Sequence, residues 1–155
     1  MDTKALLKEF VEAVYARDGE RFARLFTEDG SYDDIFYGLH KGRAQIAEMV
    51  NERFFEFAED FRWDMLDPVT EGNRVMVRCI FSYVSHFENA VKPRVLMESV
   101  SMLKLKDGLI HEYTEVVNNG PALLELGFAP EGAAKVLRKQ ASKLRARPEA
   151  QRHLQ

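Results

Sequence analysis

Apolar side chains recur at helical spacing in the first sixty residues, where three helices are expected. The first helix ends near Asp18-Gly19, and its apolar face consists of Leu7, Phe10, Val11 and Val14. The second is short and closes at Asp29-Gly30, with Phe22, Leu25 and Phe26 as its apolar residues. The third begins at Gly42, and its apolar face consists of Ile46, Val50, Phe54 and Phe57.

Elsewhere the apolar period falls to two, which is typical of strands. We expect strands over residues 31–36, 61–65, 75–83, 95–105 and 109–118, with an interruption at Asp67-Pro68. Gly72-Asn73 and Asp107-Gly108 have the composition of turns, and Asp-Gly is a strong hairpin signal. Helical periodicity returns over residues 131–147. Helices followed by an antiparallel meander predict an α+β domain with a cavity between its helices and a curved sheet.

Two aspartates stand side by side in the first expected strand, Asp33 and Asp34. Strands disfavour aspartate, and burying an ionised carboxylate is costly unless it is paired. By alternation Asp34 shares a strand face with Tyr32 and Phe36, and the bulky aromatic face is the better candidate for the cavity side. We therefore expect Asp34 to point inward and Asp33 to face water or a partner subunit. The alternative for Asp34 is a carboxylate tied into a loop or a helix N-terminus by hydrogen bonds.

Three segments then show a family resemblance: FTEDGSYDD before the first strand, GRAQI at the start of the third helix, and KLKDGLIHEYTE at the hairpin. With the order of elements, they resemble the nuclear-transport-factor-2-like superfamily, in particular its SnoaL-like polyketide cyclase and ketosteroid isomerase branch. The resemblance covers roughly residues 4–120. It implies a cone-shaped, cystatin-like roll with the N-terminal helices packed in a curved antiparallel sheet. We expect a SnoaL-like domain over residues 1–128 and a basic C-terminal helix and tail over 129–155.

The resemblance also implies candidate catalytic residues. Asp34 matches the general base of the ketosteroid isomerases, and Glu115 matches an aspartate on the last strand of the superfamily's epoxide hydrolases. Tyr15 occupies roughly the position of an aspartate that the dehydratases use. For Glu115 the alternative is a strand acid paired across the sheet with Arg78 or Arg94.

This sequence departs from both enzyme patterns. The isomerases make an oxyanion hole from a tyrosine and a protonated aspartate, and Phe10 and Ser101 stand at those positions here. The hydrolases need an Arg-x-Asp pair, and the nearest match, Arg78-Cys79-Ile80, has no acid. Neither classical reaction is therefore expected. The expected lining of the cavity combines apolar walls with hydroxyl groups: Phe10, Tyr32, Phe54, Trp63, Tyr83, Ser99, Ser101 and Tyr113.

Composition narrows the function classes. The net charge is −3; residues 129–155 carry seven basic and two acidic side chains, which leaves 15 basic and 23 acidic in the first 128. An acidic body without interleaved basic and aromatic residues argues against nucleic acid. A single cysteine and histidines without ligand spacing predict no metal and no cofactor. No stretch has the pattern of a signal peptide or a membrane span, so we expect a cytoplasmic protein without a membrane partner.

Three hypotheses follow. The first is an enzyme that uses Asp34 and Glu115 for cofactor-independent acid/base chemistry, of isomerase, cyclase or hydrolase type, on a small, mostly apolar molecule. The second is a ligand-binding or dimerisation module, in which an arginine would lock each carboxylate. The third is a structural domain whose cavity is filled by Trp63 and phenylalanines. Apolar residues expected on the outer sheet face also predict a homodimer: Met76, Ile80, Val84, Leu96, Val100 and Met102.

Overall fold

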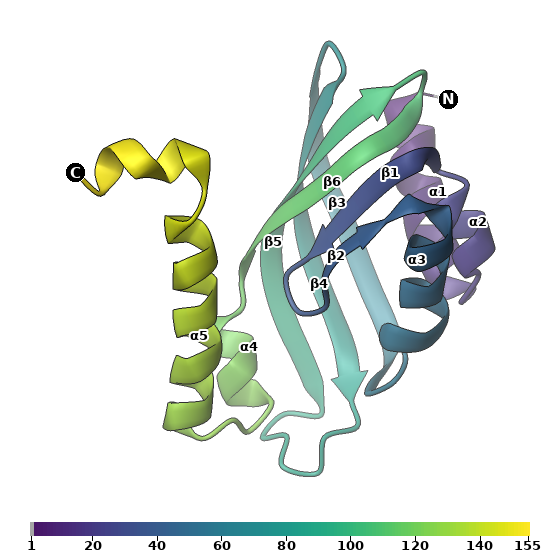
Figure 1. Ribbon diagram of the computed structural model, residues 1–155. Helices are drawn as coiled ribbons and strands as arrows, with labels where there is room; N and C mark the ends of the chain where they lie inside the picture. Colours follow the sequence, from purple (N-terminus) through teal and green to yellow (C-terminus); the bar gives the residue numbers. More distant parts are fainter. Residues whose placement is uncertain (1) are drawn as a thin grey trace.

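A computed structural model describes residues 2–155 and shows helices at both ends of a curved sheet (Figure 1). The N-terminal part comprises α1 (Thr3–Tyr15), α2 (Gly19–Ala23), β1 (Phe26–Asp34), β2 (Gly38–Lys41), α3 (Gly42–Glu48) and the π-helical turn η1 (Met49–Arg53). Four long strands follow: β3 (Ala58–Glu71), β4 (Arg74–Ser85), β5 (Arg94–Lys106) and β6 (Leu109–Asn118). The C-terminal part comprises α4 (Gly120–Glu125), α5 (Pro130–Arg145) and the 3-10 helix η2 (Pro148–His153).

The six strands form one sheet in the order β2-β1-β6-β5-β4-β3. All neighbours are antiparallel except β1 and β6, which pair in parallel with Tyr32 opposite Tyr113. The α+β class and the cone-shaped roll are therefore confirmed, with a mixed rather than wholly antiparallel sheet. The parallel pair places the end of β1 beside β6, and that junction positions the functional site.

Both expected turns are present, and their backbone explains their composition. Asp107 and Gly108 have φ of 52° and 78°, the left-handed pair of a two-residue hairpin. The expected interruption at Asp67-Pro68 is instead a bulge, because β3 continues to Glu71 with a register shift between Leu66 and Val69. Pro68 is tolerated because β3 is an edge strand, where a missing N–H breaks no ladder.

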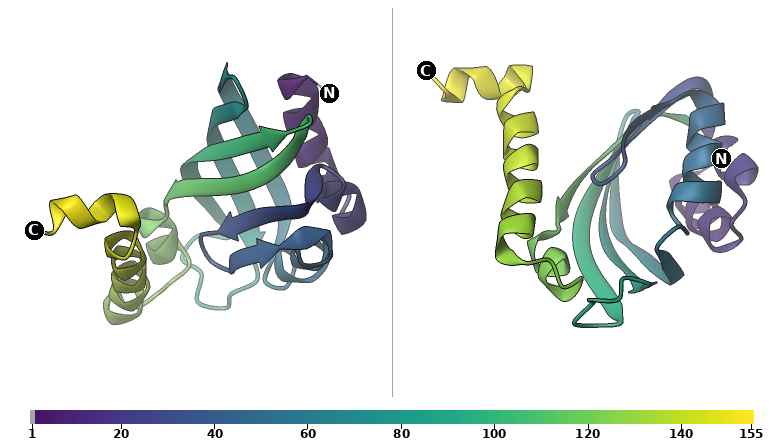
Figure 2. Two further views of the ribbon diagram at one scale, coloured as in Figure 1. Left: turned by 45° about the horizontal axis from the view of Figure 1, so that its top comes forward. Right: turned by 60° about the horizontal axis from the view of Figure 1, so that its bottom comes forward.

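The core lies between α1–α3 and the concave face of the sheet (Figure 2). Alternation on β5 holds along the strand, with Val95, Met97, Ser99, Ser101 and Leu103 buried between exposed or half-buried neighbours. Of the six apolar residues expected on the convex face, Met76, Leu96 and Val100 are exposed, and Ile80, Val84 and Met102 are half-buried. Val116 is also exposed.

Element boundaries in the N-terminal half differ from the expected ones. Phe26 begins β1 rather than ending a helix, because α2 stops at Ala23. The short strand β2 was not expected; it pairs with β1 across the turn after Asp34. The third helix changes to a π-helical turn at Met49 and does not reach Phe57.

At the C-terminus, α4 was not expected; it buries Ala122 and Leu123, and with Leu126 it packs beside β5. The apolar stripe of α5, Val136, Leu137, Ala141 and Leu144, predicts docking on the body or on a partner subunit. On the body, Val136 is half-buried and the other three are exposed, and Ala133 is the one buried residue of this helix. In all three ribbon views strands of the sheet lie between α5 and the N-terminal helices (Figures 1 and 2). The helix contacts the rest of the chain chiefly through α4.

Among the described residues, no helix is both long and apolar enough to cross a membrane.

Candidate functional site

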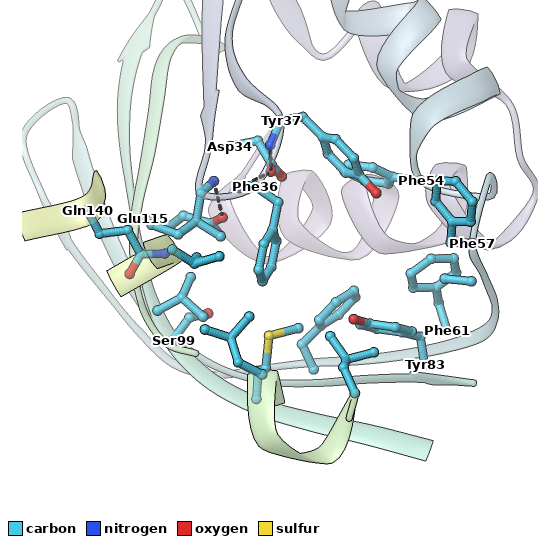
Figure 3. A pocket seen from close by; sticks show the side chains of 18 of the residues that line it. Asp34, Phe36, Tyr37, Phe54, Phe57, Phe61, Tyr83, Ser99, Glu115 and Gln140 are labelled. Atoms are coloured by element: carbon cyan, nitrogen blue, oxygen red, sulfur yellow. Dashed lines mark hydrogen bonds between the residues drawn. The ribbon is translucent and has the colours of Figure 1, made fainter. Parts of the chain in front are cut away.

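A pocket of about 430 Å³ opens at the wide end of the cone. Its walls come from the end of β1, the residues after η1, the concave face of β3–β6, α4 and α5. Aromatic rings gather toward one end in Figure 3, including Phe54, Phe61 and Tyr83, and Glu115 and Gln140 lie toward the other. The pocket is thus an apolar chamber with polar groups at one end, the usual form of a small-molecule site.

Asp34 points into this pocket from the last residue of β1, as alternation predicts, and only 6% of it is exposed. Its Oδ1 accepts hydrogen bonds from the backbone N–H groups of Phe36 (2.7 Å) and Tyr37 (2.8 Å). Oδ2 accepts none from residues 2–155. Burial raises the pKa of Asp34, and the two backbone N–H groups oppose that rise. One oxygen therefore shapes the turn before β2 and the other is left for a ligand.

Glu115 reaches the same pocket from β6. Its Oε1 accepts from the backbone N–H of Ile35 at 3.3 Å and its Oε2 from the Tyr113 hydroxyl at 3.1 Å. Burial and, secondarily, the charge of Asp34 raise the pKa of Glu115 to about 8. At neutral pH the pair therefore holds Glu115 mainly as the neutral acid.

Behind Glu115 a chain of hydrogen bonds runs into the core. The Tyr113 hydroxyl lies 2.7 Å from Ser101 Oγ, which lies 3.5 Å from Cys79 Sγ. All three side chains are fully buried. Because Tyr113 also donates to Glu115, these residues orient that carboxyl from behind.

Five of the eight expected lining residues face the pocket: Tyr32, Phe54, Trp63, Tyr83 and Ser99. The other three do not, and the expectation that they line it is wrong: Phe10, Ser101 and Tyr113. Helical spacing for Phe10 and strand alternation for Ser101 and Tyr113 place all three on inward faces, but neither pattern says how deep in the core a residue lies. The Phe10 ring packs 5.3 Å from Trp63 and 5.5 Å from Tyr113, in the core beside the wall.

Tyr15, the third expected catalytic residue, does not line the pocket. Its side chain is 48% exposed at the last residue of α1. The hydroxyl accepts from the backbone N–H of Trp63 at 2.7 Å and fastens the helix end to β3. Asp33 is half-buried and borders a cleft of about 60 Å³ beside the pocket.

Several lining residues come from segments with no expected role. Val136, Lys139, Gln140 and Lys143 of α5 form a helix face directed at the pocket. The Gln140 Nε2 is buried and has no hydrogen-bond partner among residues 2–155. Spacings of three, four and seven residues mark this face in the sequence, but two of its four members are lysines, so it carries no apolar signal.

The arginines expected as possible partners for Glu115 are engaged elsewhere. Arg78 lies 3.3 Å from Glu98 on the outer face, and Arg94 pairs with Asp60. Within residues 2–155 neither Asp34 nor Glu115 forms an ion pair. The arginine locks that would characterise a binding module are therefore not formed. The described residues also contain no group of three or more His, Cys, Asp or Glu side chains arranged to hold a metal ion.

Fold and pocket together define an α+β roll of the nuclear-transport-factor-2-like type with an apolar pocket. Residues 7–113 match the SnoaL-like domain family, and the chain belongs to that family. The match stops before Glu115 and before α5.

Solved structures agree in fold. A Catenulispora acidiphila protein with a ketosteroid isomerase-like fold, in complex with trimethylamine, superposes with a TM-score of 0.73 at 17% identity, covering 84% of this chain and 98% of that one. A SnoaL-like polyketide cyclase from Shewanella putrefaciens gives 0.67 at 16%, covering 81% and 97%. An LEH-like epoxide hydrolase of M. tuberculosis gives 0.63 at 13%, covering 87% and 94%. No curated protein matches this sequence.

Proposed function

We propose that this protein is an enzyme that performs cofactor-independent acid/base chemistry on a small, mostly apolar molecule. The observation that carries the proposal is the pair of carboxyl groups in one apolar pocket, unpaired by any arginine, with the pKa of Glu115 raised to about 8. Two acids whose surroundings separate their protonation states form a base and an acid.

In this scheme Asp34 is the base and Glu115 the acid. The two backbone N–H groups that bind Oδ1 favour the charged form of Asp34 and oppose the rise of its pKa by burial, and Oδ2 is free to take a proton. On a ketone, Oδ2 removes a proton from the carbon next to the carbonyl, and the electron pair moves to the carbonyl oxygen. Glu115 gives its proton to that oxygen, forming the enol. If the ketone carries a neighbouring carbon–carbon double bond, the enol is conjugated with it. Asp34 then returns the proton to the far end of that double bond and the enol proton returns to Glu115, which completes an isomerisation and leaves Asp34 as the carboxylate and Glu115 as the neutral acid.

A ligand-binding role without turnover is the second candidate, and one observation favours it. Asp34 Oδ1 is fully used in the turn before β2, which is the structural role expected as the alternative for this residue. In that case the pocket would hold an apolar ligand, and the charge of Asp34 would not matter to it.

The test is turnover of hydrophobic ketones, epoxides and lactones by the native chain and by Asp34→Asn. Asparagine keeps an Oδ1 acceptor for both N–H groups, so the turn is retained and only the base is lost. We expect a loss of roughly a hundredfold or more. Asp33→Asn is the matched control and keeps its turnover, because Asp33 does not line the pocket. Unchanged turnover in Asp34→Asn would rule out the acid/base role and leave the binding role.

We further propose a homodimer built on the convex face of the sheet. Met76, Leu96, Val100 and Val116 are 53%, 55%, 42% and 58% exposed there, an apolar surface that a second copy would cover. Sedimentation at micromolar concentration should give twice the chain mass, and Val100→Asp should reduce it. A monomeric mass for the native chain would contradict the proposal.

A further inference from the structure

Helix α5 presents an unexpected face to the pocket. It lines the pocket with Val136, Gln140 and two lysines, Lys139 and Lys143, while Leu137 and Leu144 are 41% and 55% exposed. Val136 and Gln140 are half-buried, and the lysines are exposed. A helix that only covered an apolar chamber would gain most by turning its leucines toward it, because burial of apolar surface is favourable. Three of the four side chains that α5 places on the pocket are instead polar.

The Gln140 amide is the most specific element of this face. Its nitrogen is buried without a partner among the described residues, and a buried donor without an acceptor is costly. The side chain extends from α5 toward the end of the pocket that holds Glu115 (Figure 3). A ligand oxygen placed there would satisfy the donor.

Charged side chains of both signs border the same end of the pocket. Lys143 lines both the pocket and the small cleft beside it, and Arg147, Asp33 and Asp34 also line that cleft. Neither Lys139 nor Lys143 forms an ion pair within residues 2–155. Of the described residues, Lys143 is therefore the free cation that lines both spaces and can attract a ligand oxygen that carries or acquires negative charge.

We infer that α5 is part of the site: the Gln140 amide donates a hydrogen bond to an oxygen of the ligand beside Glu115, and Lys143 stabilises negative charge on that oxygen. The ligand class is an apolar ring compound with one ketone or enol oxygen. The inference rests on the proposed function for its chemistry, since the enolate formed by Asp34 would develop its charge at this oxygen. It extends the site beyond the family match, which ends at residue 113.

The test is a binding comparison that needs no turnover. The probes are 2-naphthol, whose hydroxyl imitates an enol, and 2-methylnaphthalene, which has the same size but no oxygen, titrated at pH 6.5 against tryptophan fluorescence. The native chain should bind 2-naphthol more tightly. Gln140→Leu should weaken the binding of 2-naphthol by roughly tenfold, as the loss of a hydrogen bond predicts, and leave the affinity for 2-methylnaphthalene unchanged.

Lys143→Gln should weaken the binding of 2-naphthol by a smaller factor, and this factor should decrease as salt is added. Lys135→Gln is the control, because Lys135 is exposed on α5 and does not line the pocket. Equal affinity of the native chain for the two probes, or an equal loss of both in Gln140→Leu, would overturn the inference. If neither probe binds, the inference is also overturned. If the native chain binds 2-naphthol selectively but Asp34→Asn keeps its turnover, the role of Gln140 as a hydrogen-bond donor to the ligand stands and the proposed catalysis is rejected.

Discussion

Replacing Glu115 with glutamine should remove the decrease in the free energy of unfolding that Glu115 causes as the pH rises from 4.5 to about 8. The pKa of Glu115 is about 8 in the folded chain and 4.5 for an ordinary glutamate. Between these values the unfolded chain releases a proton that the folded chain retains, so the free energy of unfolding falls as pH rises. At about 1.4 kcal/mol per pKa unit, the gap from 4.5 to about 8 corresponds to a loss of about 5 kcal/mol.

Glutamine does not ionise and keeps an Oε1 acceptor for the Ile35 N–H, so the variant should not show this decline. Urea unfolding of both proteins at intervals from pH 4 to 9 measures it. The two should have similar stability at pH 4, and the variant should be the more stable by up to about 5 kcal/mol at pH 9. Glu112→Gln, on the exposed face of the same strand, should follow the native profile. Parallel profiles for native protein and Glu115→Gln would refute the burial argument.

Three further outcomes test other parts of the structure. In urea unfolding, Gly127→Ala should have a lower free energy of unfolding than Gly38→Ala by more than about 1 kcal/mol. Both glycines have positive φ, but only at Gly127 would the added carbon meet the Asn89 carbonyl oxygen. Tyr113→Phe removes a hydrogen bond that lowers the pKa of Glu115, so the pH at which Glu115 titrates, followed by carbon NMR, should rise; no movement would contradict the bond. Deletion of residues 129–155 should leave the circular dichroism of the sheet intact and move the pKa of Glu115 toward its ordinary value, because water then reaches the pocket; an unmoved pKa would show that α5 does not shield it.

Strand faces were predictable because alternation is a local property. The inward faces of β5 and of the end of β1 follow directly from the apolar pattern, and with them the direction of Asp34. The parallel pairing of β1 with β6, which brings Glu115 to the same pocket, was not predicted. The expectation that Asp34 and Glu115 serve one site came from the family resemblance and not from periodicity.

The sequence patterns could not predict how deep a side chain lies in the core or where helix α5 packs. Periodicity places Ser99 and Ser101 on one face, yet Ser99 lines the pocket and Ser101 lies beyond it in the core. Leu137 and Leu144 suggest a docking stripe on α5, but the direction of this helix depends on how the turn after α4 sets it against the body. Gln140 carries no signal in the sequence, since an exposed and a pocket-lining glutamine look alike.

Strand β1 can find its parallel partner only after most of the chain exists. Ile35, whose backbone N–H donates to the side-chain carboxyl of Glu115, is 80 residues from it in the sequence. The hairpins among β3–β6 close over short loops, whereas joining β1 to β6 closes a long one, a late and slow step in folding. The two carboxyl groups therefore meet only when the roll has closed, and a chain with a frayed β1 would keep most of its sheet while losing its acid pair. A ligand that contacts both carboxyl groups would then stabilise the pairing of β1 with β6 and slow the separation of these two strands.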